Sequence, residues 1–164
     1  MKILLVEDNP ESIESAKMQF ADHELTIVSS CEKALGAFRG HCSRWERHKL
    51  YDLIMTDMEI PIGEDTLTSG SAIRESNPTS LLPGGLVVAL FATKLDVPCL
   101  VLTDANGHKS VLGYMIEEIV SSSTRRPSDG GKGLLATNTR PSWIDTPLGK
   151  GKDWRAACPE EWIS

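Results

Sequence analysis

A few polar residues that could bind metal or phosphate follow short apolar runs at separate points of the sequence. Each is among the first polar residues after its run: Glu7, Asp8, Asp57 and Thr103. Carboxylates held close together repel one another unless a cation neutralises them. Mg2+ prefers such oxygen ligands and keeps several of its waters, and it would also attract a phosphate group. These residues could therefore form a magnesium and phosphate site, provided that the fold brings the ends of the three runs together.

The apolar runs belong to a pattern in which strand-like and helix-like segments alternate. Short runs rich in branched residues predict buried strands at 2–6, 25–29, 53–55, 99–102 and 133–139. Helices are predicted at 10–22, 31–48, 86–95 and 110–120, with a short closing helix at 154–162 that a proline interrupts. Such alternation is typical of an α/β domain, a doubly wound five-stranded parallel sheet with helices on both faces. The carboxyl ends of parallel strands meet at one edge of the sheet, so the polar residues above are expected to gather there.

Length and composition favour a single domain without a membrane segment. The chain has 164 residues, of which 40% are hydrophobic, enough to bury one core. Two stretches poor in apolar residues, 61–85 and 121–151, are predicted to be long loops of this single domain (1–164), with no separate output domain. The net charge of −6 disfavours direct nucleic-acid binding, and the longest apolar runs are too short to cross a membrane. We therefore expect a cytoplasmic protein, in which the four cysteines stay reduced.

Three blocks of the sequence carry a pattern that is specific when they are taken together. They are ILLVEDNP at 3–10, DLIMTDMEIP at 52–61 and PCLVLT at 98–103. In this order the blocks resemble the receiver domain of two-component response regulators, over about the first two thirds of the chain. The resemblance implies a flavodoxin-like fold with strand order 2-1-3-4-5.

The same resemblance implies roles for individual residues. Asp57 would accept a phosphoryl group from a histidine kinase or a phosphotransfer protein. Glu7, Asp8, Asp57 and the main-chain carbonyl of Glu59 would hold Mg2+. The Thr103 hydroxyl would contact the phosphoryl oxygen and couple its arrival to movement at the surface.

This chain departs from the receiver pattern at the cation that contacts the phosphoryl group. Receivers carry a lysine followed by proline after the fifth strand, whereas here Arg140 precedes a proline, and Lys150 and Lys152 stand before the last helix. We predict that Lys152 fills this role, because an ammonium at the end of a Gly-Lys-Gly turn is able to reach a phosphate; Arg140 and Lys150 are the alternatives. Asp104, where receivers have a small residue, adds a carboxylate that would weaken phosphoryl retention or strengthen metal binding.

Three functions are compatible with these residues. The first is a phosphorylatable switch that acts on a separately encoded output protein. Its docking surface would be the face formed by the helix at 110–120, the strand at 133–139 and the final helix at 154–162, reached from Thr103 through 104–115. No enzymatic activity beyond autophosphorylation and autodephosphorylation at Asp57 is expected. The second is a pseudo-receiver, a binding module that keeps the fold without the chemistry. The third is a Mg2+-dependent phosphatase or a toprim-like enzyme, since both need acids after a buried strand. The three sequence blocks favour the first.

Overall fold

The core of the protein is a parallel sheet. The computed structural model describes residues 1–39, 50–61, 84–103, 135–138 and 142–163. Its five parallel strands follow the order β2-β1-β3-β4-β5, which is the predicted flavodoxin-like order. Their bounds are β1 (Lys2–Val6), β2 (Glu24–Val28), β3 (Leu53–Thr56), β4 (Cys99–Leu102) and β5 (Leu135–Asn138). Each of the five predicted strands is present, with ends that differ by one or two residues at most.

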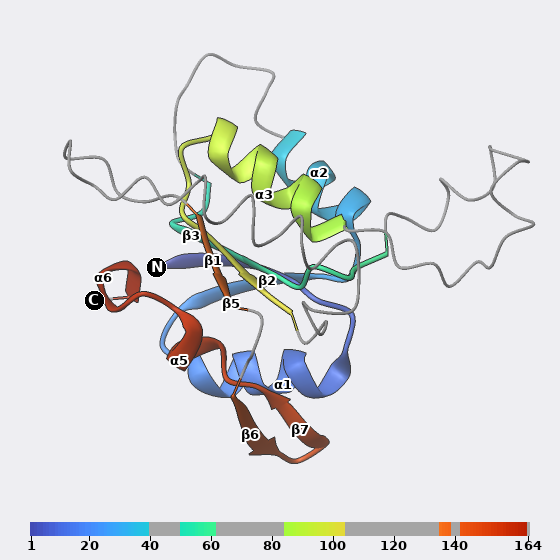
Figure 1. Cartoon of the computed structure of the whole chain (residues 1–164), viewed down its shortest axis with the longest axis vertical. Helices are drawn as coiled ribbons and strands as arrows, with labels where there is room; N and C mark the ends of the chain where they lie inside the picture. The colour runs from blue at the N-terminus through green and yellow to red at the C-terminus, as the bar shows by residue number, and fades with distance from the viewer. Residues whose placement is uncertain (40–49, 62–83, 104–134, 139–141, 164) are drawn as a thin grey trace, which may run out of the picture.

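Helices cover both faces of this sheet, as the alternating pattern predicts. Figure 1 shows α2 (Cys31–Arg39) and α3 (Gly84–Lys94) on one face and α1 (Pro10–Gln19) on the other. The strands β1, β3 and β4 bury both of their faces, and successive residues contribute to two separate cores. Leu4 of β1 packs in the core beneath α2 and α3, whereas Leu5 packs in the core beneath α1. This explains why these strands read as continuous apolar runs.

Helix α1 begins directly after the first predicted site residues, and its start has a local cause. The Asn9 side chain caps the helix, because its Oδ1 accepts a hydrogen bond of 2.9 Å from the Ser12 main-chain N–H. Pro10 occupies the first helical turn, where its missing N–H is not needed. The cap ties the chain at Asn9 and therefore limits how far the preceding Glu7 and Asp8 can move from the sheet edge.

The end of the chain contains a hairpin that the sequence pattern did not predict. Strands β6 (Trp143–Thr146) and β7 (Gly149–Lys152) pair in antiparallel fashion, so the prediction of one long loop at 121–151 was wrong in this part. A strand with one buried face usually alternates apolar and polar residues, but the hairpin does not. At Gly151, where β7 lies against α1, glycine stands in place of an apolar residue. A Cβ at Gly151 would overlap the main-chain oxygen of Glu11 and the side chain of Ser15. Close backbone contact therefore holds the hairpin to α1. A hairpin attached in this way has no apolar pattern in the sequence that would predict it.

Two short helices follow the hairpin and lie on the same face of the sheet as α1 (Figure 1). They are α5 (Trp154–Ala157) and α6 (Glu160–Ile163), and the predicted interruption at Pro159 separates them. Trp154 is fully buried, and its Nε1 donates a hydrogen bond of 3.0 Å to the Ser12 carbonyl. Trp162 lies in the same core, so the tail packs against the domain.

Some predictions fall on residues that the structure does not describe. They include residues 40–48 of the helix predicted at 31–48, the helix at 110–120, the route at 104–115, Asp104, Arg140 and most of the loop at 61–85. The helix predicted from residue 86 starts two residues earlier, at Gly84, and so shortens that loop. Among the described helices, none has both the length and the apolar character that spanning a membrane requires.

Candidate functional site

The strand register brings the predicted acidic residues together. Val6 of β1 pairs with Thr56 of β3, so the next residues, Glu7 and Asp57, leave the sheet side by side. Thr103 follows β4, the neighbour of β3 on the other side, and its side chain is buried. The Asp57 N–H donates to the Val6 carbonyl at 3.0 Å, which holds the start of the Asp57 loop against β1. The predicted convergence of these strand ends is therefore present in the fold.

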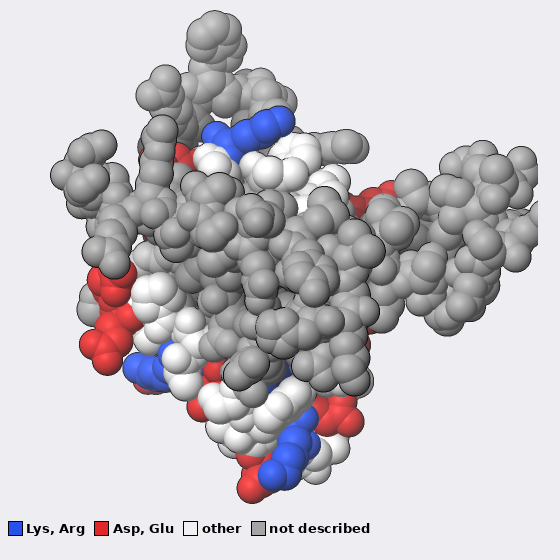
Figure 2. Space-filling view, in the orientation of Figure 1, with Lys and Arg blue, Asp and Glu red and all other residues white. Residues whose placement is uncertain are grey.

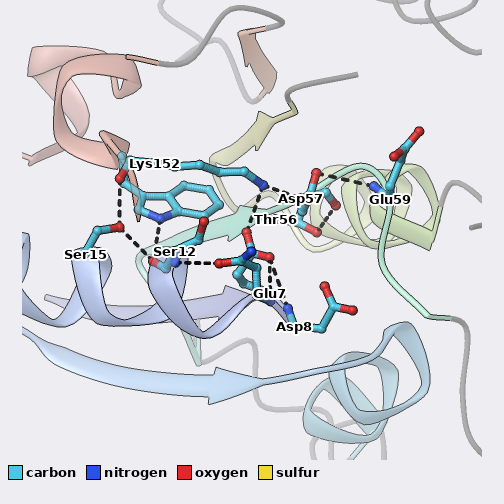
Figure 3. A network of polar contacts seen from close by, with 10 residues as sticks. Glu7, Asp8, Ser12, Ser15, Thr56, Asp57, Glu59 and Lys152 are labelled. Atoms are coloured by element: carbon cyan, nitrogen blue, oxygen red, sulfur yellow. Dashed lines mark hydrogen bonds and ion pairs between the residues drawn. The ribbon is translucent and has the colours of Figure 1, made fainter. Parts of the chain in front are cut away.

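Lys152 joins this cluster from the far end of the sequence. Its Nζ donates a hydrogen bond of 2.6 Å to Asp57 Oδ2 and one of 2.9 Å to Glu7 Oε2. Lys152 ends β7 (Gly149–Lys152), and Figure 3 shows its side chain extending to the space between the carboxylates of Asp57 and Glu7. Only 2% of Lys152 is exposed, so both ion pairs are shielded from water. Of the two candidate lysines, Lys152 is the one that contacts Asp57, and the third candidate, Arg140, lies outside the described residues.

Burial and charge oppose each other at Lys152. Burial by itself lowers the pKa of Lys152, but the carboxylates of Glu7 and Asp57 outweigh this effect and raise the pKa above its usual value. The ammonium is therefore held in its charged form, which is the form that can neutralise a phosphoryl group. Lys152 Nζ also lies 5.5 Å from the centre of the Trp154 ring, a cation–π contact that supports the same charge state.

Glu7 lies at the bottom of the cluster with both of its carboxylate oxygens bonded. Oε2 accepts from Lys152, and Oε1 accepts from the main-chain N–H groups of Asp8 and Asn9 at 3.1 and 3.0 Å. Burial raises the pKa of Glu7, and the opposing charge of Lys152 offsets this only in part. Glu7 therefore depends on Lys152 to remain an anion in the interior.

Helix α1 anchors the main chain of Lys152 and so aims its side chain. The Lys152 carbonyl accepts hydrogen bonds from Ser15 Oγ at 2.8 Å and from Gln19 Nε2 at 3.3 Å. Gln19 also accepts from the Arg155 N–H at 2.7 Å, which ties the start of α5 to the same helix. These contacts hold the base of the lysine on a rigid element while its Nζ reaches across to another strand.

The Asp57 loop is held from the opposite side by α3. The Gly85 N–H donates to the Met58 carbonyl at 3.1 Å, and a Cβ at Gly85 would overlap the main chain of Asp57 and Met58. Thr56 Oγ1 donates to the Asp57 carbonyl at 2.8 Å. The Glu59 N–H donates to Asp57 Oδ1 at 3.4 Å, so each oxygen of this carboxylate has a donor. The loop thus fixes both the position and the orientation of Asp57.

A polar hollow of about 210 Å3 opens above Asp57. Its lining residues come from both ends of the chain: Asp8, Asn9, Ser12, Asp57, Glu59, Trp143 and Lys152. Asp57 is 7% exposed, so its carboxylate is buried on most sides but accessible through this hollow. Asp8 lies at the exposed rim, where partial desolvation and, to a smaller extent, the charge of Asp57 raise its pKa.

The donor set around the hollow suits a magnesium ion held by few protein ligands. Asp8, Asp57 and Glu59 supply oxygen atoms, and an open polar hollow leaves space for waters on a hydrated cation. Glu7, which is also a predicted metal ligand, is enclosed beneath Lys152 and does not line the hollow, so its part in metal binding stays a prediction. Within the described part of the chain, no group of three or more histidine, cysteine and acidic side chains has the arrangement of a metal cage. The carboxylates of Asp8 and Asp57 at the hollow would therefore suit a hydrated ion.

Solved structures similar to this chain come from response regulators. The Mn2+-bound form of response regulator Rcp1 has 21% identity over 70% of this chain and 73% of its own, with a TM-score of 0.46. Response regulator TrrA from Thermotoga maritima, in complex with Mg2+ and BeF, has 24% identity over 70% of this chain and 80% of its own, with a TM-score of 0.42. The Francisella response regulator 1452 receiver domain has 15% identity over 84% of this chain and 83% of its own, with a TM-score of 0.43. The likeness is to receiver domains, and it is one of fold.

No protein-family model matches the sequence, and no curated protein matches it either. At these identities and TM-scores, the function proposed below rests on the geometry around Asp57.

The structure also separates Lys152 from its neighbour Lys150. The Lys150 side chain is 74% exposed and lies 3.9 Å from Asp145 across the hairpin. Figure 2 shows basic and acidic side chains next to each other at this end of the molecule. Sequence reasoning missed Trp143 and Ser15 as parts of the site. Lys150 and Lys152 share a face of the hairpin, because residues two apart in a strand do, and only Lys152 lies over the sheet edge. No local signal in the sequence distinguishes the two.

Proposed function

We propose that this protein is a receiver whose Asp57 accepts a phosphoryl group. The observation that carries the proposal is the 2.6 Å contact between the buried Lys152 ammonium and Asp57 Oδ2, beside a hollow that leaves the same carboxylate accessible. A carboxylate that attacks phosphorus needs little covalent assistance but much neutralisation of charge. Lys152 offers a fixed positive charge at the oxygen atoms where negative charge would build up.

The proposed step transfers a phosphoryl group between two molecules. One oxygen of Asp57 forms a bond to phosphorus while the bond from phosphorus to the donor's leaving atom breaks. The donor keeps that electron pair and takes a proton from solvent. Lys152 moves its hydrogen bond from the Asp57 carboxylate to an oxygen of the new phosphoryl group, while Glu7 continues to hold the ammonium from below. Thr103, at the end of β4, would contact another phosphoryl oxygen.

Asp8 and Asp57, together with the main-chain carbonyl of Glu59, would hold a hydrated Mg2+ in the proposed site. When bound, the ion would neutralise part of the charge on the phosphoryl oxygens. Glu7 supports the site through its ion pair with Lys152. Asp8 has the role of an exposed ligand at the rim, where a carboxylate can exchange protein contacts for water.

The proposed partners follow from this chemistry. A histidine kinase or a phosphotransfer protein would donate the phosphoryl group, in the cytoplasm, and a separately encoded output protein would read the phosphorylated form. The added group carries about −1.5 to −2 units of charge, which is sufficient to bias a two-state surface. The predicted route through Thr103 to 104–115 lies outside the described residues and stays a prediction.

The assignment of Asp57 is tested by direct phosphorylation. The protein is incubated with Mg2+ and a small phosphodonor such as phosphoramidate, and intact mass is measured. We expect one phosphoryl group on the wild type and none on Asp57→Asn. Asp52→Asn is the matched control, because Asp52 is an exposed carboxylate just before the same strand and should not affect the reaction. A modification that persists in Asp57→Asn would remove the assignment.

One observation favours a second function, that of a pseudo-receiver which docks to a partner without being phosphorylated. Among the described residues, no buried side-chain nitrogen or oxygen lacks a hydrogen-bond partner, so the cluster is satisfied without a ligand. Such a cluster could serve stability alone. This second function would be supported if the wild type takes up no phosphoryl group and if millimolar Mg2+ causes no shifts in its amide NMR spectrum.

A further inference from the structure

The hairpin brings a second side chain to the hollow besides Lys152. Trp143 of β6 lies directly opposite Lys152 of β7 in the antiparallel register. Side chains of directly opposed residues leave the same face of a two-stranded ribbon. Lys152 reaches Asp57 from this face, and Trp143 lines the hollow above Asp57. The hairpin therefore brings a cation to the Asp57 carboxylate and an aromatic ring to the hollow that this carboxylate also lines.

The close backbone contact that attaches the hairpin to the domain is made by Gly151 and not by Trp143. The next residue pair, Ile144 and Gly151, has the opposite orientation, and Gly151 lies against the backbone of α1. Trp143 is 44% exposed, so it belongs to neither of the two cores. An indole left at the surface in this way exposes apolar area that would be more stable if buried. Its position is better explained by the hollow that it borders.

The chemical character of Trp143 differs from that of the other residues around the hollow. Among the described residues that line it, Trp143 is the single large apolar side chain, and the remainder are polar or charged. Polar walls attract water, and water is the molecule that removes a phosphoryl group from a carboxylate. An indole ring at the hollow occupies space there without offering a hydrogen-bond acceptor that could orient an attacking water.

We propose that Trp143 shields phosphorylated Asp57 from water and thereby sets the lifetime of the acyl phosphate. This inference rests on the proposed function. In the reaction that it slows, a water oxygen bonds to phosphorus, the bond between phosphorus and the Asp57 oxygen breaks, and its electron pair returns to the carboxylate. Inorganic phosphate leaves, and the proton released from water passes to phosphate or solvent. Trp143 takes no covalent part in this reaction and acts by excluding the nucleophile.

The test compares the lifetimes of the phosphorylated protein and its variants. Each protein is phosphorylated with phosphoramidate and Mg2+, the donor is removed, and the phosphorylated fraction is followed by intact mass. We expect Trp143→Ala to lose its phosphoryl group about threefold to tenfold faster than the wild type, since a tenfold change in rate needs only about 1.4 kcal/mol in the barrier. Trp143→Phe keeps an aromatic ring and should retain most of the wild-type lifetime.

Leu148→Ala is the matched control. Leu148 is another exposed apolar residue of the same hairpin, at 59% exposure, but it does not line the hollow. The acyl phosphate of the Leu148→Ala variant should therefore have the same lifetime as that of the wild type. Trp143→Gln provides a second variant in case Trp143→Ala does not fold, and its polar amide should shorten the lifetime in the same direction.

The outcomes separate this inference from the proposed function. A faster loss in Trp143→Ala or Trp143→Gln, with unchanged thermal unfolding and an unchanged Leu148→Ala, supports the shielding role. Equal lifetimes in the wild type and the Trp143 variants would overturn the inference while phosphorylation of Asp57 still stands. A wild type that is never phosphorylated would overturn the proposed function and this inference with it.

Discussion

At the scale of single residues, Lys152 holds two buried carboxylates that come from different strands. Its Nζ lies 2.9 Å from Glu7 and 2.6 Å from Asp57, and the ammonium and Glu7 are almost completely enclosed. Two like charges so near to each other are stable in the interior only while a cation stands between them. The two ion pairs therefore add little net stability, because the cost of desolvation offsets much of their attraction. Their main effect is to prevent repulsion between two buried carboxylates.

We predict that Lys152→Met lowers the free energy of unfolding by about 3 kcal/mol at neutral pH, because it leaves uncompensated charge in the interior. Urea denaturation measures this change. Lys150→Met is the matched control two residues away, and since Lys150 is exposed, its effect should stay within about 0.5 kcal/mol. Equal effects of the two substitutions would contradict the assignment of Lys152 as the buried partner.

The cost of Lys152→Met should depend on pH, with a sign that follows from Glu7. Burial already raises the pKa of Glu7 above 4.5, and loss of the lysine removes the charge that lowers it. Between the pKa of Glu7 in the unfolded chain and its higher pKa in the folded variant, the folded form binds a proton that the unfolded chain has released. The free energy of unfolding of the variant therefore falls as pH rises through this interval. The difference from the wild type should be larger at about pH 8 than at about pH 5. A difference that grows on acidification would contradict this account.

At the scale of elements, the position of the hairpin depends on Gly151, which has no side chain to separate β7 from α1. The backbone of β7 approaches α1 so closely at Gly151 that a Cβ would overlap Glu11 and Ser15. This close approach lets Ser15 bond the Lys152 carbonyl, and the lysine then extends from a fixed base. The strength of the contact between the hairpin and α1 therefore decides whether the cation reaches Asp57.

We predict that Gly151→Ala destabilises the protein by about 1 to 3 kcal/mol, the usual cost of overpacking, and slows phosphorylation of Asp57. The reason is that a displaced β7 draws Lys152 away from the carboxylate. Thermal unfolding and the rate of phosphorylation by phosphoramidate are the measurements.

The control for this substitution is Gly36→Ala in α2. A Cβ at Gly36 would meet no atom within 4 Å, and alanine is the better helix former, so the protein should become more stable by about 0.5 to 1 kcal/mol. Its phosphorylation rate should not change. If Gly151→Ala behaved as Gly36→Ala does, the close packing of the hairpin on α1 would not be what positions the lysine.

At the scale of the whole molecule, the site joins one edge of the sheet to the C-terminal part of the chain. Lys152 connects Asp57 to β7, and β7, α5 and α1 are linked by the hydrogen bonds of Ser15, Gln19 and Trp154. These elements lie on one face of the sheet, whereas α2 and α3 lie on the other (Figure 1). A change at Asp57 that moves Lys152 therefore has a direct mechanical connection to the face with α1.

We predict that Mg2+ with beryllofluoride, a mimic of the phosphoryl group, changes amide hydrogen exchange in 10–19 and 143–157 more than in α2. To contact the mimic, the Lys152 ammonium has to give up part of its hydrogen bonding to Glu7 and Asp57. Because Lys152 belongs to β7, this change should affect the hairpin. Mass spectrometry of peptides measures the exchange, and Asp57→Asn is the control that should show no change. Protection changes confined to the loop at 57–60 would contradict a connection through the hairpin.

The sequence by itself determined the sheet and the gathering of its acidic residues. Buried strands such as β1 and β4 need apolar side chains on both faces, and this requirement leaves a continuous local signal. The order of strands and helices then places Glu7 and Asp57 at one edge, because the carboxyl ends of parallel strands coincide. The cap at Asn9 and the break at Pro159 are equally local, since each depends on one residue and its near neighbours.

Only the tertiary structure decided how the cation reaches this edge. Lys152 lies 95 residues from Asp57 in the chain, and its burial depends on the register of a hairpin and on a glycine contact with α1. Lys150 has the same residue type and the same strand, yet it is exposed, because position relative to the sheet edge differs while local propensity does not. Trp143 was not predictable for the same reason. Its place above Asp57 follows from pairing with Lys152, a contact between strands that no local pattern encodes.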